Sequence, residues 1–422
     1  MRYAIVGCGS RHQMFRDALC GPYAHLHDLV ALCDNNPERL ALSIRQANRP
    51  IAGYAAGDFR SMIVQTRPDI VIVTTPDDLH AQFILAAFDA GCDVICEKPL
   101  TVDADALTAI LAAQERTGRK LTVTFNYRYS PARTQIRELI AAGTIGRVTA
   151  VEFSWHLDRV HGADYFRRWH RQKTRSGGLF VHKATHHFDL LNWWLGSSPV
   201  QVTAQGARNF YCADTATSLG LTQRGARCTD CADITKCSFA LDLTANDNLR
   251  TLYRDAETVD GYHRDACIFS DEVAIEDTLQ AQISYASGAS VNYTLTAFAP
   301  WEGCEVRFHG TKGQLYHRNV EVHGIFGGTR GAQQVEELTT QLHLAGAAPL
   351  NITIPEGSGD HGGADPLMLQ CLFDEPKNVP PDPMARAADH RAGTLSVLTG
   401  LAANRAMEIG QPIVLDDLFT SP

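Results

Sequence analysis

Short apolar segments alternate with helix-compatible segments along the first third of the chain. Segment 69–75 is almost wholly apolar, which is typical of a parallel strand buried on both faces. Repeated alternation of strand and helix predicts a doubly wound parallel sheet, whose ligands bind at the carboxyl ends of the strands. The pattern therefore also predicts the edge of the sheet where a site should lie. The expected strands are 2–7, 29–33, 69–75, 93–96 and 121–125.

The loop after the first expected strand is rich in glycine. Its sequence, GCGSRH, matches G-x-G-x-x-G at Gly7 and Gly9 and has His12 in the third place. The first two glycines permit a tight turn and a close approach of the backbone to a pyrophosphate, whereas the third eases helix–strand packing. The phosphate site at the helix N-terminus should therefore persist without the third glycine.

The second expected strand is followed by Asp34. Its spacing from the glycine loop is about that of the acid that holds the ribose hydroxyls of adenosine. A carboxylate in this place repels a 2′-phosphate, which favours NAD over NADP. The nearby Arg39 leaves NADP open.

Polar motifs follow the remaining strands, and together they resemble one family. With Gly7-x-Gly9 and Asp34, the motifs resemble the glucose–fructose oxidoreductase/inositol dehydrogenase family over nearly the whole chain. The Glu-Lys-Pro element is the most specific mark. The other motifs are Thr75-Pro76-Asp77-x-x-His80, Glu97-Lys98-Pro99 and Asn126-Tyr127-Arg128.

The resemblance implies an α/β fold in two domains. A Rossmann domain is expected at 1–126, and an α/β domain with an open, mainly antiparallel sheet at 127–385. Residues 386–422 are expected to form a C-terminal helix that packs back on the body. In the second domain, segments 279–285 and 290–295 alternate as an antiparallel hairpin, and 333–351 is expected to lack regular structure.

The resemblance also implies a nicotinamide cofactor and a carbohydrate or polyol substrate. Lys98 would lie beside the nicotinamide and the reacting hydroxyl. An ammonium there stabilises a developing alkoxide and, with its pKa lowered by the positive ring, exchanges a proton. The residues expected to bind the cofactor are Gly7, Gly9, Ser10, Arg11, Asp34, Thr75, Pro76, His80, Glu97 and Asn126.

Segment 176–196, SGGLFVHKATHHFDLLNWWLG, reads as one long helix that Gly196 ends. Helical spacing places His182, His186 and Asp189 on one stripe, and two imidazoles beside a carboxylate suit proton transfer. In the family, His186 matches the catalytic histidine, and His182 replaces an aspartate. His182 is expected to act as the base, to hold substrate or to extend a proton relay. A metal bound by this stripe is the lesser alternative.

Other candidate substrate residues come from separate stretches. The resemblance gives Tyr127 and Arg128 positioning roles, and a glycine-flanked turn at 360–365 brings His361 close to the substrate or is a plain turn. Segment 164–175 carries five lysines and arginines, which read as a solvated loop, or as arginines that pair with the cofactor or a neighbouring subunit, more than as an anion site. Its aromatic residues could face a sugar ring or belong to the core. The expected substrate-binding residues are Tyr127, Arg128, Asp189 and His361.

Three of the twelve cysteines have the spacing of metal ligands. Cys228-x-x-Cys231-x5-Cys237 lies in a polar loop that thiolates on a zinc ion would fix. Members of this family branch carry a counterpart of Cys267, which makes it the expected fourth ligand of a structural zinc. The alternatives are an iron–sulfur cluster, whose usual cysteine spacings differ from this one, and free thiols. The alternative fourth ligands are Cys212 and His263.

Composition limits the classes of function. A formal net charge of -9 argues against a general nucleic-acid binder, and no apolar run reaches the length of a membrane span. With no apolar leader at the N-terminus, a cytoplasmic protein is expected. In the family, the open face of the second sheet often makes a dimer, so a homodimer or homotetramer is expected.

These observations favour an NAD-dependent oxidoreductase that acts on a secondary hydroxyl of a sugar, sugar acid or glycoside. Lys98, His186 and His182 are the expected catalytic residues. A glycosidase that keeps NAD bound through oxidation, elimination, hydration and reduction is the alternative. A non-catalytic NAD-binding sensor is the least favoured reading.

Overall fold

The computed structural model describes residues 1–321, 337–355, 357 and 360–419, without the side chains of 360 and 361. Contacts divide the chain into two compact units. The first contains 1–129, 241–265 and 358–394, and the second contains 130–240, 266–357 and 395–422. Segments 241–265 and 358–394, which lie within or across the expected second domain, thus return to the first unit.

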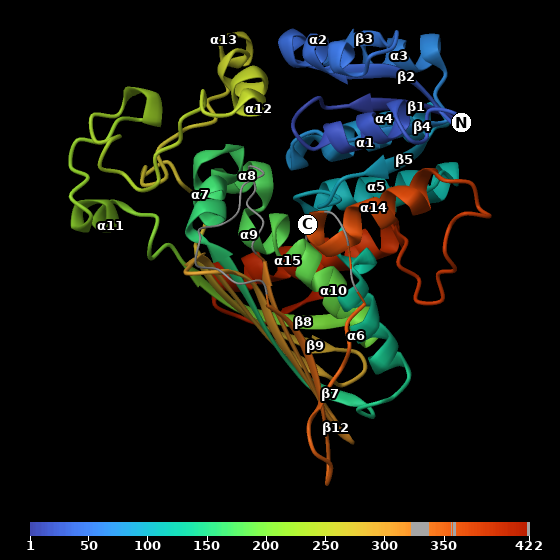
Figure 1. Cartoon of the computed structure of the whole chain (residues 1–422), viewed down its shortest axis with the longest axis vertical. Helices are drawn as coiled ribbons and strands as arrows, with labels where there is room; N and C mark the ends of the chain where they lie inside the picture. The colour runs from blue at the N-terminus through green and yellow to red at the C-terminus, as the bar shows by residue number, and fades with distance from the viewer. Residues whose placement is uncertain (322–336, 356, 358–359, 420–422) are drawn as a thin grey trace. The chain divides into compact units, whose positions relative to one another are not determined.

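The first unit is built on a seven-stranded sheet (Figure 1). Strand β1 lies between β2 and β4, and every neighbouring pair is parallel except β15 on β6. This arrangement confirms the doubly wound sheet expected from the alternating pattern. In spatial order the strands are β15 (Ala388–Asp389), β6 (Leu121–Val123), β5 (Asp93–Cys96), β4 (Ile70–Val73), β1 (Arg2–Val6), β2 (Asp28–Asp34) and β3 (Ala52–Ala55).

Helices follow the strands of this sheet in the expected order. Helix α2 begins with Pro37, and the Asn36 side chain accepts hydrogen bonds from the N–H groups of Glu38 and Arg39, which caps the helix. The core beside the glycine loop includes Phe15 and Phe373, although they are 358 residues apart in sequence. The helices are α1 (His12–Cys20), α2 (Pro37–Gln46), α3 (Phe59–Thr66), α4 (His80–Asp89), α5 (Ala104–Thr117), α12 (Asp247–Leu249), α13 (Glu257–Asp260) and α14 (Asp360–Phe373).

The second unit is built on a nine-stranded sheet (Figure 1). All its neighbouring strands are antiparallel except β7 and β10, which confirms the mainly antiparallel sheet. In spatial order the strands are β14 (Leu350–Asn351), β13 (Glu337–Leu344), β12 (Gly313–Glu321), β11 (Glu302–Gly310), β7 (Val148–Asp158), β10 (Ser290–Ala299), β9 (Thr278–Tyr285), β8 (Pro199–Ala207) and β16 (Ile413–Val414).

Helix α10 packs against one face of this sheet, with α6 beside it (Figure 1). Its Trp194 indole donates to the carbonyl oxygen of Arg133 on α6 (3.0 Å), and its ring meets Phe308 of β11 edge to face. The helices are α6 (Pro131–Ala141), α7 (Arg159–Arg167), α8 (Lys173–Ser176), α9 (Gly178–His182), α10 (Thr185–Leu195) and α11 (Ala213–Ser218). Helix α15 (His390–Ile409) contributes its residues from 395 onward to this unit.

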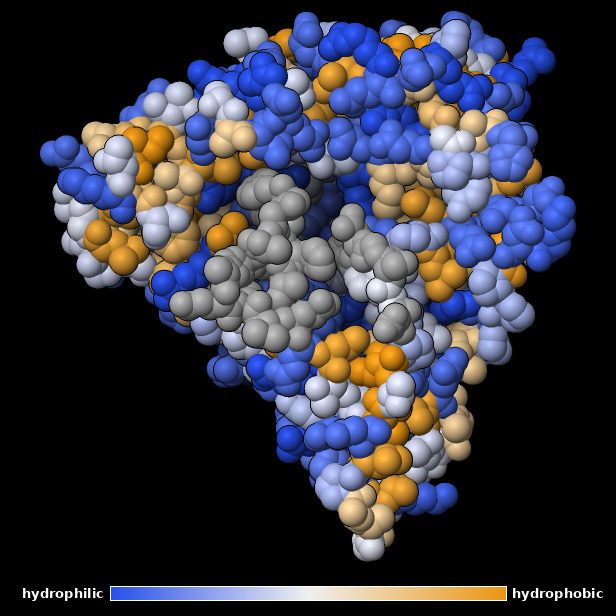
Figure 2. Space-filling model, in the orientation of Figure 1, coloured by the Kyte–Doolittle hydropathy of each residue, from blue (hydrophilic) through white to orange (hydrophobic). Residues whose placement is uncertain are grey.

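Two expectations for the second half of the chain are wrong. Residues 337–344, expected to lack regular structure, form β13, while 333–336 lie outside the described residues. The turn expected at 360–365 is the beginning of α14. Leu338 and Leu344 of β13 and Leu350 of β14 are exposed, and Figure 2 shows hydrophobic residues gathered over the lower part of the second unit.

Candidate active site

The glycine loop after β1 has the backbone that a dinucleotide site needs. Gly7 has a φ of +94°, and a Cβ there would lie 2.7 Å from backbone atoms of Thr74 and Thr75. No heavy atom lies within 4 Å of a Cβ placed on Gly9. Gly7 therefore lets β1 and β4 approach closely, and Gly9 borders open space.

His12, which replaces the third glycine, is fully buried. Its Nε2 lies 2.6 Å from the Ser43 hydroxyl of α2, and its Nδ1 hydrogen-bonds the carbonyl oxygen of Gly9. Burial lowers the pKa of the imidazole to about 4, so the ring is neutral near pH 7. His12, in place of the third glycine, thus links the glycine loop, α1 and α2 by hydrogen bonds.

Asp34 lies at the carboxyl end of β2. Its carboxylate accepts hydrogen bonds from the backbone N–H of Cys8 and from that of Asn36, the latter at 2.7 Å. Burial raises the pKa of Asp34, while these backbone donors and Arg39 oppose the rise. The strand end thus holds the carboxylate firmly beside the glycine loop.

Arg39, which left NADP open at the sequence level, is buried in an ion pair. Its Nη1 lies 2.7 Å from Asp260, and its Nε donates to the carbonyl oxygen of Leu252 (3.0 Å). Both partners come from segment 241–265, which packs on α2. The guanidinium is therefore already engaged by the protein.

His80 and Thr75 lie at the ends of β4 and the helix that follows. His80 is buried, with its two ring nitrogens 3.0 Å from the Thr75 carbonyl oxygen and 2.7 Å from that of Pro99. Burial lowers its pKa, against the effect of these two carbonyls. His80 thus fixes the backbone beside Lys98. The hydroxyl of Thr75 is buried and makes no hydrogen bond within the described part of the chain.

Arg11, Glu97 and Asn126 meet at the carboxyl ends of the strands around Asp365. Arg11 Nε lies 2.7 Å from Glu97, and its Nη1 lies 3.4 Å from Asp365. The Asn126 amide donates to the other oxygen of Asp365 (2.6 Å). Asp365 was not among the predicted site residues, although its segment, 360–365, was expected to lie close to the substrate or to form a plain turn. The side chain of His361, in the same segment, lies outside the described residues.

Tyr127 and Arg128 lie in a short 3-10 helix (Asn126–Tyr129) and are almost fully buried. Arg128 donates to the carbonyl oxygen of Ala385 within the same unit (3.3 Å). This packing gives both residues a place in the core of the first unit. Their expected role in positioning substrate stays a prediction.

In the second unit, the helix expected at 176–196 is interrupted. Helix α9 ends at His182 and α10 begins at Thr185, because the N–H groups of Lys183 and Ala184 both donate to the carbonyl oxygen of Leu179. The prediction of one helix is therefore wrong. His182 ends one helix and His186 lies in the first turn of the next, each with 8% of its surface exposed.

The second stripe of this segment packs on the sheet. His187 Nδ1 lies 2.8 Å from the Tyr293 hydroxyl, and its ring stacks on Trp155 at 4.3 Å. The Nζ of Lys183 lies over the same indole, 4.6 Å from the centre of the Trp155 ring. Asp189 of α10 is also buried. These contacts fix α10 so that His186 has a defined place.

Segment 164–175 is ion-paired, and it is buried from Asp164 to Arg167 and at His170, while Gln172 and Thr174 are exposed. Arg168 pairs with Asp164 (3.2 Å) and Lys173 pairs with Glu276 (2.8 Å). The reading as a solvated loop is wrong, since Tyr165 and His170 are buried and their rings contact His182 at 5.5 Å and 4.2 Å. The sequence signal for this contact was the aromatic content of the segment.

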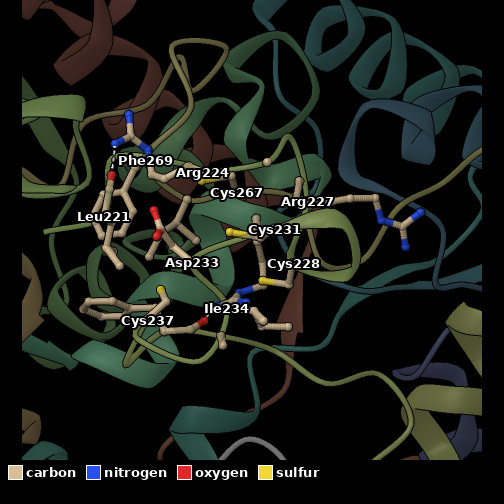
Figure 3. Close-up of a pocket in the computed structure, with 16 residues that line it drawn as sticks. Leu221, Arg224, Arg227, Cys228, Cys231, Asp233, Ile234, Cys237, Cys267 and Phe269 are labelled. Atoms are coloured by element: carbon tan, nitrogen blue, oxygen red, sulfur yellow. Dashed lines mark hydrogen bonds between the residues drawn. The ribbon is translucent and has the colours of Figure 1, made fainter. Parts of the chain in front are cut away.

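Four cysteines line one pocket of the second unit: Cys228, Cys231, Cys237 and Cys267 (Figure 3). A backbone bridge between Arg227 and Ala266 brings Cys267 alongside the CxxC turn. Burial raises the pKa of the Cys237 thiol, and the three neighbouring cysteines raise it further. Within the described ranges, no three histidine, cysteine or carboxylate side chains are arranged to hold a metal ion.

Comparisons with known proteins agree with both units. Residues 1–125 match the family "Oxidoreductase family, NAD-binding Rossmann fold", and 137–415 match "Oxidoreductase family, C-terminal alpha/beta domain". The "Putative oxidoreductase YteT" of Bacillus subtilis is 34% identical over 434 residues, which cover 98% of each chain. The inositol 2-dehydrogenase of Rhizobium meliloti is 32% identical over 210 residues, 49% of this chain and 58% of the relative.

A solved structure of similar fold contains a nicotinamide cofactor. The WlbA dehydrogenase from Bordetella pertussis, in complex with NADH and UDP-GlcNAcA, aligns with a TM-score of 0.64 and 19% identity over 98% of both chains. At this identity the likeness concerns the fold. Among the described residues, no helix combines the length and apolar composition that a membrane span requires.

Proposed function

The chain belongs to the glucose–fructose oxidoreductase/inositol dehydrogenase family, and we propose that it oxidises a secondary hydroxyl of a sugar, sugar acid or polyol with NAD. The observation that carries the cofactor is the glycine loop at Gly7 and Gly9, with open space beside Gly9. Bound NAD would supply the acceptor for the hydride that leaves the alcohol carbon. Relatives named for inositol support the substrate class.

The residues around the strand ends fit this cofactor. Asp34 would accept hydrogen bonds from the ribose hydroxyls. The buried hydroxyl of Thr75 makes no hydrogen bond within the described part of the chain, so it would be available to the cofactor. Arg39 is paired with Asp260 instead of being directed to a 2′-phosphate. The carboxylate of Asp34 and the pairing of Arg39 support NAD over NADP.

Lys98 and His186 are the proposed acid/base residues. An ammonium at Lys98 would stabilise the alkoxide that develops as hydride departs, because positive charge is most effective where negative charge forms. His186 would accept the hydroxyl proton, since an imidazole can hold and release a proton near neutral pH. His182 would share this proton or hold substrate.

The test is oxidation of candidate alcohols by the purified protein with added NAD. We expect NADH to accumulate, measured by absorbance, with at least one of myo-inositol, D-glucose, D-xylose and a methyl D-glucoside. NADP in place of NAD should give a much slower reaction. Absence of NADH with every alcohol, from protein that binds NAD, would reject the dehydrogenase proposal.

The contact between His170 and His182 favours one second candidate. A glycosidase that oxidises, eliminates, hydrates and reduces must move more protons than a dehydrogenase, and two adjoining imidazoles would serve them. Release of the aglycone from an aryl glycoside without net NADH would support this cycle, which rests on one retained NAD per chain.

A structural zinc at Cys228, Cys231, Cys237 and Cys267 is a further proposal about the cofactors. The CxxC spacing and the shared pocket support it, and binding would require the thiols to move together from their places in the structure. Native mass spectrometry of protein purified without chelator tests it, because one zinc per chain adds a defined mass. The same spectrum would give the proposed homodimer or homotetramer.

A further inference from the structure

Three side chains of the second unit form a hydrogen-bonded chain outside the proposed acid/base residues. Glu302 of β11 accepts at 2.9 Å from Nδ1 of His161, and Nε2 of His161 lies 3.1 Å from the Tyr165 hydroxyl. His161 and Tyr165 are four residues apart on α7, and their rings stack at 5.2 Å. A carboxylate, an imidazole and a phenol are thus connected in series.

The backbone around this chain fixes all three groups. The second oxygen of Glu302 accepts from the N–H of Asp158 (2.8 Å), and Asp158 in turn caps α7 through the N–H groups of Val160 and His161. A Cβ on Gly162 would lie 1.6 Å from the carbonyl oxygen of Ala297, so this glycine lets α7 lie directly on β10. The hydrogen-bonded series of Glu302, His161 and Tyr165 is therefore preorganised.

The partners determine where the proton on His161 lies. A buried carboxylate accepts, so Nδ1 must carry the hydrogen that Glu302 binds. Nε2 of the neutral ring is then the acceptor for the Tyr165 hydroxyl. This is the arrangement in which a carboxylate orients an imidazole to take a proton from a hydroxyl and stabilises the imidazolium formed.

The hydrogen-bonded series has a neighbour for proton exchange at Tyr165 and an outlet to solvent at His161. Tyr165 contacts the ring of His182 at 5.5 Å and that of His170 at 5.4 Å. His161 keeps 17% of its side chain exposed, whereas Glu302 keeps 1%. A proton that reaches His161 can therefore pass to solvent. Glu302 also interacts electrostatically with His156 of β7, Asp158 caps α7, and Asp164 and Arg168, on either side of Tyr165 in the sequence, pair with each other.

We propose that Glu302, His161 and Tyr165 form a proton relay, which carries the substrate hydroxyl proton from His182 to solvent once His186 has accepted it and shared it with His182. Protonated His182 gives its proton to the Tyr165 oxygen while the Tyr165 hydroxyl proton moves to Nε2 of His161. The imidazolium, stabilised by Glu302, then gives its Nε2 proton to water, which returns His161 to the neutral ring with hydrogen on Nδ1. Bound NAD would supply the acceptor for the electron pair, as hydride, so protons and electrons balance. Tyr165, His161 and Glu302 are positioning and relay residues, and the inference rests on the proposed oxidation.

The kinetic test compares Tyr165→Phe with Tyr211→Phe. Tyr211 is also buried, but its hydroxyl donates to the carbonyl oxygens of Ala297 (2.8 Å) and Arg159 (3.2 Å), so its loss affects packing alone. With an alcohol that wild type oxidises, we expect Tyr165→Phe to lower kcat about 100-fold with unchanged KM for NAD. Tyr211→Phe should keep kcat within about two-fold of wild type, with a lower Tm.

Rescue distinguishes a relay from a structural role. Imidazole added as buffer should raise kcat of Tyr165→Phe in a saturating manner and leave wild type unchanged, because small bases can replace a missing relay. Glu302→Gln should lose activity similarly, since its amide has one oxygen to serve both Asp158 and His161. A Tyr165→Phe enzyme with kcat near wild type, or one that imidazole does not rescue, would overturn the relay.

A measurement without substrate separates this inference from the proposed function. The His161 Nδ1–H bound to Glu302 should give a far-downfield proton NMR signal in wild type, lost in Glu302→Gln and shifted in Tyr165→Phe. If no alcohol yields NADH, the oxidation proposal fails while this signal still judges the hydrogen-bonded chain. Absence of the signal in wild type contradicts the relay.

Discussion

Arg39 of α2 and Asp260 of α13 form a buried ion pair of 2.7 Å although 221 residues separate them. The pKa of Asp260 is lowered: burial opposes this, but the Asn36 side chain, the Tyr262 backbone N–H and Arg39 outweigh it. Asp260 therefore remains charged near neutral pH and holds the guanidinium near Asp34. A segment inserted from the middle of the chain thus acts on the cofactor end of the first sheet.

Substitution of Asp260 by alanine should relax the choice of cofactor. Freed from its carboxylate, Arg39 could bind a 2′-phosphate, so we expect the KM for NADP to fall about 10-fold while that for NAD changes little. Steady-state kinetics with both cofactors measure this. Asp255→Ala, a substitution at an exposed residue of the same segment, is the control. An unchanged KM for NADP in Asp260→Ala would show that Arg39 does not reach the 2′-phosphate of NADP.

Lys98→Met should abolish oxidation while NAD still binds. Loss of a charge that acts only on the developing alkoxide lowers kcat, and we expect a fall of about 1,000-fold with little change in the Kd for NADH. Initial rates and NADH fluorescence titration measure the two effects. The exposed Lys120→Met is the matched control. A Lys98→Met enzyme that retains a tenth of wild-type kcat would contradict the role given to Lys98.

Asp365→Asn should weaken cofactor binding through Arg11 and Asn126. The amide cannot balance the Arg11 guanidinium, and it must turn its NH2 group toward one of two donors. We expect the Kd for NADH to rise about 10-fold, measured by fluorescence. Glu115→Gln, on the exposed side of α5, should leave the Kd unchanged. Equal affinities in both variants would mean that this network serves the fold alone.

His12 should make the first unit sensitive to acid. Its pKa is about 4 when folded against 6.5 in an unfolded chain, so the unfolded state binds the proton more readily between these values. Neutral His12 therefore makes its full contribution to the free energy of unfolding above pH 6.5. This contribution falls by about 3 kcal/mol as the pH drops toward 4. In His12→Asn, Tm should depend less on pH over this range. The exposed His25→Gln should keep the wild-type slope, and a His12→Asn slope equal to wild type would contradict the assignment.

Gly162→Ala should destabilise the second unit. The added methyl group would lie 1.6 Å from the Ala297 carbonyl oxygen, so α7 must move away from β10. We expect a loss of about 3 kcal/mol in the free energy of unfolding. Thermal unfolding measures the change, with Gly57→Ala as the control because its Cβ would meet nothing within 4 Å. A Tm equal to wild type would show that α7 shifts without cost.

The sequence predicted five of the seven strands of the first sheet, because each of these is a short apolar run that ends in a polar motif. It did not predict β3 and β15, the strands at the two edges, which lack such a run. It could not predict that Asp260 or Asp365 lies at those strand ends. Such contacts depend on how segments more than 200 residues away return to the sheet, which no local periodicity encodes.

In segment 176–196 the sequence predicted which residues are helical but not where the helix is interrupted. Its helical spacing was read correctly over 185–195, yet the break at Lys183 depends on backbone hydrogen bonds to Leu179 that spacing does not express. Likewise, the charges of 164–175 suggested solvent, and only the acids opposite them on other elements, such as Glu276, make their burial possible.

The place of Phe373 affects how the protein forms during synthesis. Its buried ring contacts Tyr3 and Phe15 in the core of the first unit. A nascent chain that has released its first 129 residues from the ribosome therefore lacks part of that core until the last eighth of the chain is being made. Until then the N-terminal sheet exposes apolar surface, so chaperones that bind such surface have the longest time to act on this incomplete unit.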